Sequence, residues 1–130
     1  MNSKKEINSK KAPGAIGPYS QAVKANGLIY TSGQIPLTPS GELIERDIKK
    51  QTRQVLENLK NLLNDAKSSM DRVIKVTIYL ENMDDFAVVN VLYAEAFGEH
   101  KPVRSTVAVR TLPKNVLVEM DAIAQPYDYC

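Results

Sequence analysis

The chain has 130 residues, of which 43% are hydrophobic and 25% charged, and its net charge is +2 at pH 7. This length suits one globular domain, and the small net charge does not favour nucleic acid as a partner. No apolar run reaches the roughly 20 residues that span a bilayer, residues 1–11 do not resemble a secretory signal, and the one cysteine excludes an internal disulfide. We expect a cytoplasmic single domain over residues 1–130, with no membrane partner, a flexible tail at 1–11 and Cys130 as a free surface thiol.

A loop, a hairpin and a long helix are predicted for the first half. Residues 12–19 contain two prolines and two glycines, which disfavour regular pairing. Strands at 20–25 and 28–32 flank Asn26-Gly27, a dipeptide that favours a two-residue turn because both positions need positive φ. Apolar residues spaced by three, four and seven then predict an amphipathic helix over 47–67.

A strand, a helix and two further strands are predicted for the second half. Residues 73–80 are rich in β-branched side chains and predict a strand. Asn82 is a suitable N-cap for a helix over 84–97. The last strands, 103–109 and 116–124, are expected to pair as a terminal hairpin. The order β-β-α-β-α-β-β predicts an α+β domain with a mixed sheet and both helices on one face. The bare face of such a sheet favours self-association.

Few side chains are available for catalysis. His100 is the sole histidine and is expected in the loop after the second helix. A His-pair nuclease and a His-rich metal site are therefore ruled out. The chain has no Gly-rich phosphate loop, and Ser32 and Ser105 have no partner histidine for a nucleophilic triad. We expect neither a metal nor a cofactor.

The terminal strands carry the remaining candidates. Alternation places Arg104 and Thr106 on one face of their strand, and Glu119 and Asp121 on one face of theirs. With an even connecting loop, Arg104 and Glu119 would share a face at a separation of about 13 Å, which leaves room for a small substrate and a water. The alternative is that both are separate surface charges, and a bulge would reverse the parity. Asn90 adjoins an apolar helix stripe, where an amide needs a hydrogen-bond partner.

Several short motifs resemble, in order and spacing, those of the Rid family, also called YjgF or reactive-intermediate deaminase. They are residues 17–22 (GPYSQA), 32–36 (SGQIP), 89–91 (VNV) with Tyr93, 104–107 (RSTV), 112–113 (LP) and 118–120 (VEM). The likeness covers about residues 12–124. It implies a bacillus-type chorismate-mutase-like fold and a homotrimer with ligand clefts between subunits. It also implies hydrolysis of 2-imino acids, such as 2-iminopropanoate and 2-iminobutanoate, to 2-keto acids and ammonia. These imino acids are released by pyridoxal-phosphate enzymes.

The resemblance also implies roles for individual residues. Arg104 would clamp the substrate carboxylate, and Glu119 would orient the attacking water. The other substrate-binding residues would be Tyr19, Ser32, Gly33, Asn90 and Thr106, the last through its backbone. A protonated imine is already electrophilic, so one carboxylate can position the water and return its proton to the leaving nitrogen. A site without histidine, cysteine or metal suits this reaction.

Two other functions remain open. One is a module that binds small carboxylic acids without turnover, and the retention of Arg104 and Glu119 counts against it. The other is a ribonuclease or translation inhibitor, an activity ascribed to some relatives. The lone histidine and the near-neutral charge disfavour this reading.

Overall fold

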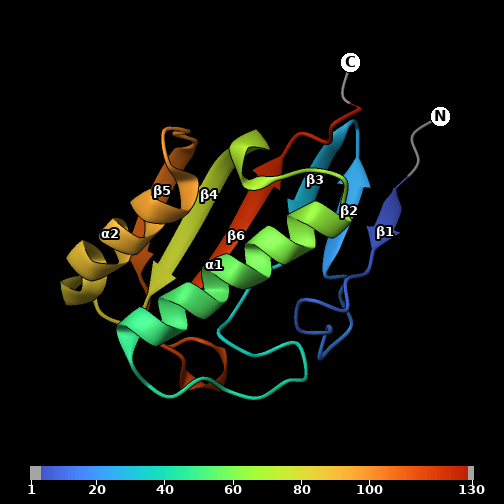
Figure 1. Ribbon diagram of the computed structural model, residues 1–130. Coiled ribbons are helices and arrows are strands. Elements are labelled where there is room, and N and C mark those ends of the chain that lie inside the picture. The colour runs from blue at the N-terminus through green and yellow to red at the C-terminus, as the bar shows by residue number, and fades with distance from the viewer. Residues whose placement is uncertain (1–3, 129–130) are drawn as a thin grey trace.

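The computed structural model describes residues 4–128 as one six-stranded sheet with two α-helices on one face (Figure 1). The strands are β1 (Lys5–Ile7), β2 (Ala22–Ala25), β3 (Leu28–Thr31), β4 (Val73–Leu80), β5 (Val103–Ala108) and β6 (Val118–Ala124). The helices are α1 (Ile48–Asp65) and α2 (Phe86–Phe97), with short 3-10 turns at Met70–Arg72, Met83–Asp85 and Pro113–Asn115. The expected mixed α+β fold is confirmed.

The hairpin β2-β3 forms around the predicted turn. Asn26 and Gly27 have φ values of 53° and 76°, as a two-residue hairpin turn requires. Ala25 pairs with Leu28 across this turn. Here a local sequence signal is sufficient to fix the register and the strand ends at the turn, whereas the outer ends, expected at residues 20 and 32, lie at Ala22 and Thr31.

The N-terminal segment departs from the flexible tail expected for residues 1–11. β1 pairs antiparallel with β2, and the Ser9 hydroxyl donates to Asp65 at 2.5 Å. The buried Gln21 side chain accepts from the Ser9 N–H and donates back to the Ser9 carbonyl. β1 was missed because three residues, two of them charged, show no apolar alternation. Residues 1–3 and Cys130 lie outside the described part of the chain.

α1 supplies the main cover of the sheet. Asp47 caps its first turn by accepting from the Lys50 N–H at 2.9 Å. The apolar stripe of α1 includes Val55, Leu59 and Leu62, which are fully buried against the inner face of the sheet. Each such side chain contributes on the order of 1.5–3 kcal/mol through burial. The predicted amphipathic helix is therefore the element that closes the core.

α2 explains the order of the strands. The helix crosses over from β4 to β5, so β5 returns parallel to β4 at the edge of the sheet. The full order is β1-β2-β3-β6-β4-β5, and over residues 4–128 β4 with β5 is the only parallel pair. The expected terminal hairpin is therefore wrong, because β4 lies between β5 and β6. The two strands that carry Arg104 and Glu119 do not touch.

Candidate functional site

The strand order places Arg104 and Glu119 on opposite faces of the sheet. Arg104 pairs with Val76, whose side chain is buried beneath the helices. Glu119 pairs with Tyr79 and precedes the buried Met120, so the Glu119 side chain points to the face without helices. The shared face expected from a hairpin is wrong. Their strands are two apart, about 10 Å across the sheet.

β5 and α2 build the first group, which we call the arginine half-site: Phe86, Asn90, Tyr93, Arg104 and Thr106. Arg104 Nη1 donates to Oδ1 of Asn90 at 2.7 Å. Arg104 Cζ lies 4.9 Å from the Tyr93 ring centroid and 5.5 Å from that of Phe86. Such cation–π contacts restrain a guanidinium. Among residues 4–128, no carboxylate forms an ion pair with Arg104. The cation is held in place while its charge is left for another anion.

Two buried hydroxyls add polar capacity to the arginine half-site. Tyr93 is 7% exposed, and its hydroxyl and that of Thr106 have no hydrogen-bond partner among the described residues. Burial raises the pKa of Tyr93, although the nearby charge of Arg104 lowers it. Buried polar groups normally have partners. These two hydroxyls therefore mark hydrogen-bonding capacity that the described residues do not use.

Loop residues and β6 build the second group, which we call the glutamate half-site: Tyr19, Ser32, Gly33 and Glu119. A Cβ on Gly33 would overlap Oε2 of Glu119 and would lie 2.8 Å from its Cδ. Glycine is therefore the residue that lets the carboxylate keep this position. Tyr19, Ser32 and Gly33 line a hollow of about 20 Å³, which is roughly the room one water needs. A substrate of several heavy atoms needs additional space.

Two carboxylates lie near each other on the helix-free face of β6. The Tyr79 hydroxyl donates to Oδ2 of Asp121 at 3.0 Å. Burial raises the pKa of Glu119, and the carboxylate of Asp121 raises it further. Burial also raises the pKa of Asp121, whereas the hydrogen bond from Tyr79 and the charge of Lys75 lower it. A carboxyl group whose pKa is raised in this way is suited to moving protons.

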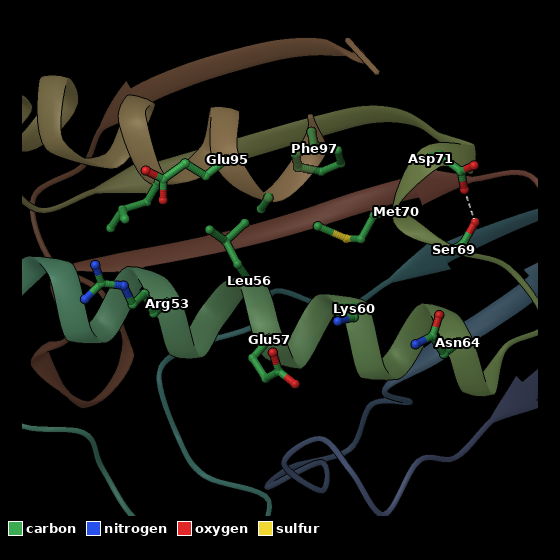
Figure 2. A pocket seen from close by; sticks show the side chains of 12 residues that line it. Arg53, Leu56, Glu57, Lys60, Asn64, Ser69, Met70, Asp71, Glu95 and Phe97 are labelled. Carbon is green, nitrogen blue, oxygen red and sulfur yellow. Dashed lines mark hydrogen bonds between the residues drawn. The ribbon is translucent and has the colours of Figure 1, made fainter. Parts of the chain in front are cut away.

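A much roomier groove shares no residue with either half-site, although its Phe97 contacts Tyr93 of the arginine half-site. Its volume is about 710 Å³, and it runs between α1 and α2 on the outer side of the helices (Figure 2). Charged side chains of both signs, among them Arg53 and Glu95, flank the apolar Leu56 and Phe97. None of the predicted site residues lines this groove. Volume alone therefore does not identify the candidate site.

Other possible chemistry is sparse in the described part of the chain. His100 lies in the loop after α2, as expected, with Nε2 2.6 Å from the Val73 carbonyl oxygen. Within residues 4–128, no group of three or more His, Cys, Asp or Glu side chains is arranged to hold a metal ion. Over the same residues, neither helix has the length and apolar character needed to cross a membrane.

The predicted residues thus gather in two groups instead of one. Sequence reasoning missed the aromatic support of Arg104 and the bond between Tyr79 and Asp121. The period-two spacing of Glu119 and Asp121 was a usable signal for neighbouring carboxylates. The partner of Asp121 had no such signal, because Tyr79 comes from a distant strand.

Nearly the whole chain is similar to one family of known proteins. The family model described as Endoribonuclease L-PSP matches residues 9–126. A RutC family protein of Pyrococcus horikoshii is 55% identical over 122 residues, which cover 93% of this chain and 97% of that protein. TdcF of Escherichia coli, named as a candidate reactive intermediate deaminase, is 44% identical over 124 residues, with 93% and 96% covered. A Schizosaccharomyces pombe protein, named mmf1 and mitochondrial, is 50% identical over 127 residues, with 95% and 77% covered.

Solved structures agree with the sequence comparisons. YyfA of Yersinia pestis, described as a Rid family protein, has a TM-score of 0.92 and 49% identity, with 95% of this chain and 99% of that chain covered. TdcF of Escherichia coli with bound serine has a TM-score of 0.88 and 43% identity, with 93% and 98% covered. Sequence and backbone similarity extend over both half-sites.

Proposed function

The chain belongs to the endoribonuclease L-PSP family, also named Rid or YjgF, and from this premise we propose that it hydrolyses 2-imino acids to 2-keto acids and ammonia. The family includes a candidate reactive intermediate deaminase. One observation carries the proposal for this chain. Within residues 4–128 no carboxylate pairs with the restrained cation of Arg104, and Glu119 is a half-buried carboxyl group with a raised pKa. These are an anchor for a substrate carboxylate and an acceptor for a proton.

Arg104 is the proposed anchor. The planar guanidinium presents parallel N–H groups that match a carboxylate in a bidentate pair. The bond to Asn90 and the stacking on Tyr93 fix the plane of this fork before the substrate arrives. Pre-orientation of this kind places the imine carbon for attack without a further loss of entropy. The backbone of Thr106 would contact the same end of the substrate.

Glu119 is the proposed proton carrier. Its carboxylate takes a proton from water, and the water oxygen bonds to the carbon of the protonated imine while the C=N π electrons move to nitrogen, which leaves a neutral –NH2 group. Glu119 then returns the proton to that nitrogen. The Glu119 carboxylate, free again, accepts the hydroxyl proton while the O–H electrons form the C=O bond. The C–N bond breaks, ammonia leaves, and Glu119 passes the proton to solvent. Tyr19, Ser32 and Gly33 would line this side of the cleft.

We also propose that two copies of the chain complete each site. Arg104 and Glu119 point to opposite faces of one sheet, so Arg104 of one copy would meet Glu119 of a neighbour. A homotrimer with clefts between subunits and the chorismate-mutase-like arrangement satisfies this requirement. Tyr30, Val103 and Val107 expose apolar surface on the helix-free side. Light scattering should give three times the chain mass of 14.4 kDa, and a monomer at micromolar concentration would contradict the trimer.

The activity is tested by following keto-acid release from freshly generated 2-iminopropanoate. We expect release well above the spontaneous rate, and at least ~10²-fold slower release with Arg104→Ala. Binding of 2-oxobutanoate without faster release would instead support a carboxylate-binding module. The structure of TdcF of Escherichia coli with bound serine is the reason to test this second function. Cleavage of single-stranded RNA without imine hydrolysis would support a ribonuclease.

The proposed location is the cytoplasm. A chain with a single cysteine suits a reducing compartment, although relatives in two yeasts are named as mitochondrial. Fractionation of the source cells, with the protein in an organelle fraction, would contradict this location.

A further inference from the structure

Three side chains on the helix-free face form a group that the proposed reaction uses only in part: Tyr79, Glu119 and Asp121. We propose that Tyr79 and Asp121 are positioning residues for Glu119. Tyr79 holds the Asp121 carboxylate close to Glu119, so that Glu119 is the member of the pair that takes and returns the proton. This inference deepens the proposed function and depends on it for its kinetic consequence.

The strand register brings the three side chains together. Tyr79 pairs directly with Glu119, and Thr77 pairs with Asp121. Residues two apart on a strand point to the same face, about 7 Å apart. The Tyr79 hydroxyl crosses diagonally to Oδ2 of Asp121 at 3.0 Å. On another side, Gly33 lies against the Glu119 carboxylate. The two acidic groups are therefore restrained near each other.

The surrounding charges give the two carboxyl groups different tasks. Asp121 has two features that favour its ionised form, the Tyr79 hydrogen bond and the charge of Lys75, and both come from β4. Glu119 faces Tyr79 on β4, the uncharged Gly33, and Asp121 on its own strand. The causes that shift its pKa, burial and the charge of Asp121, both raise it. When one proton is available to the pair, Glu119 is thus the group that takes it.

This division suits the proposed chemistry. A carboxyl group with an ordinary pKa is a weak base at pH 7, and its protonated form is scarce there. A raised pKa strengthens the base and makes the return of the proton to nitrogen easier. Asp121 would remain ionised and would act on the reaction only through Glu119.

The effect of Asp121 and Tyr79 on the titration of Glu119 can be tested without measuring turnover. Carboxyl ¹³C NMR titration of the full protein would follow Glu119, with its signal assigned through Glu119→Gln. We expect the Glu119 midpoint to fall in Asp121→Asn, because the neighbouring negative charge is gone. It should fall by less in Tyr79→Phe, where Asp121 loses its donor and shares the proton. Glu57→Gln, the same kind of charge removal on the exposed side of α1, should leave it unchanged.

The kinetic arm uses the same variants. The comparison is made one pH unit below the midpoint of the wild-type profile of kcat against pH. There, the fraction of its own maximal kcat that Asp121→Asn retains should be about two- to fivefold larger than the fraction that the wild type retains. Asn retains an acceptor oxygen for Tyr79, so the fold should persist, and thermal melting checks this. A Glu119 midpoint that stays at the wild-type value in both Asp121→Asn and Tyr79→Phe would overturn the inference. NMR shifts in a protein without deaminase activity would overturn the proposed function alone.

Discussion

The arginine half-site and the glutamate half-site are built from different parts of the fold. Arg104 lies on an exposed edge strand, and a helix supplies its aromatic and amide supports. Glu119 lies on an inner strand of the sheet, next to loop backbone and a second carboxylate. The arginine half-site keeps the charge of Arg104 accessible. In the glutamate half-site, burial raises the pKa of Glu119.

The difference indicates that the two half-sites have different roles, anion binding for Arg104 and proton transfer for Glu119. An exposed guanidinium binds an anion in the ground state and the transition state alike. A half-buried carboxyl group contributes mainly when a proton moves. Variants of the two halves should therefore fail in different ways.

Glu119→Gln should have the largest effect. We expect kcat to fall by about 10²–10⁴-fold, because glutamine keeps the shape but does not take up a proton at neutral pH. Calorimetric titration with 2-oxobutanoate should show nearly unchanged binding. Glu95→Gln, the same change on α2, is the matched control and should retain full activity. If Glu119→Gln lost binding while Arg104→Ala retained it, the two roles would be reversed.

Arg104→Ala should fail at binding as well as turnover. We expect kcat/KM to fall by at least ~10²-fold and keto-acid binding to disappear, because the bidentate contact is lost in every state. Arg104→Lys should also be poor, since an ammonium lacks the planar fork. Arg53→Ala, in the groove between the helices, is the control. Near-wild-type turnover by Arg104→Ala would refute its assignment as the anchor.

Mixing the two inactive variants tests whether the halves meet between copies. Arg104→Ala and Glu119→Gln, unfolded and refolded together in equal amounts, should recover about one quarter of wild-type activity, since that share of the sites combines two intact halves. Each variant refolded alone is the control. If the mixture stayed as inactive as its parents while mixed trimers formed, the halves would not meet between copies.

Gly33→Ala should disturb the glutamate half-site alone. The added methyl group would displace the end of the Glu119 side chain, and we expect about a tenfold loss of kcat with little change in stability. Thermal melting of Gly33→Ala checks that the fold is retained. Wild-type kcat in Gly33→Ala would contradict the close contact.

The smallest expected effect concerns stability. Because burial raises the folded-state pKa of Glu119, the native state binds its proton more tightly than the unfolded chain does. The contribution of Glu119 to stability is therefore fully present below its pKa in the unfolded chain, and it is lost as pH rises through its pKa in the folded protein. Glu119→Gln should raise Tm by about 1–3 °C at pH 7 and leave it unchanged near pH 3.5. A lower Tm at pH 7 for Glu119→Gln than for wild type would contradict this sign.

Local patterns were sufficient for most elements but not for their order in the sheet. Asn26-Gly27 fixed a hairpin, and the apolar stripe of 47–67 fixed a helix, because both signals lie within one short segment. The partner of β5 depended on the crossover through α2, which brings it back beside β4. A non-local pairing of this kind leaves no mark on the residues of β5 itself.

The site residues, too, could be predicted only where the signal lies within one strand. Alternation correctly grouped Arg104 with Thr106, and Glu119 with Asp121, inside their own strands. Whether the two pairs share a face of the sheet depended on which strands β5 and β6 pair with, and the alternation of side chains did not specify this. The roles of the residues came from family resemblance, whereas the contact of Asp121 with Tyr79 required the folded chain.

The placement of the two halves on opposite faces has a consequence for how activity depends on protein concentration. In the proposed trimer, a correctly folded single chain is chemically silent. Dilution below the dissociation constant of the trimer would abolish specific activity while every strand and helix remained in place. A newly made chain would likewise stay inert until it met its partners. Catalysis would then report on assembly, and not on folding.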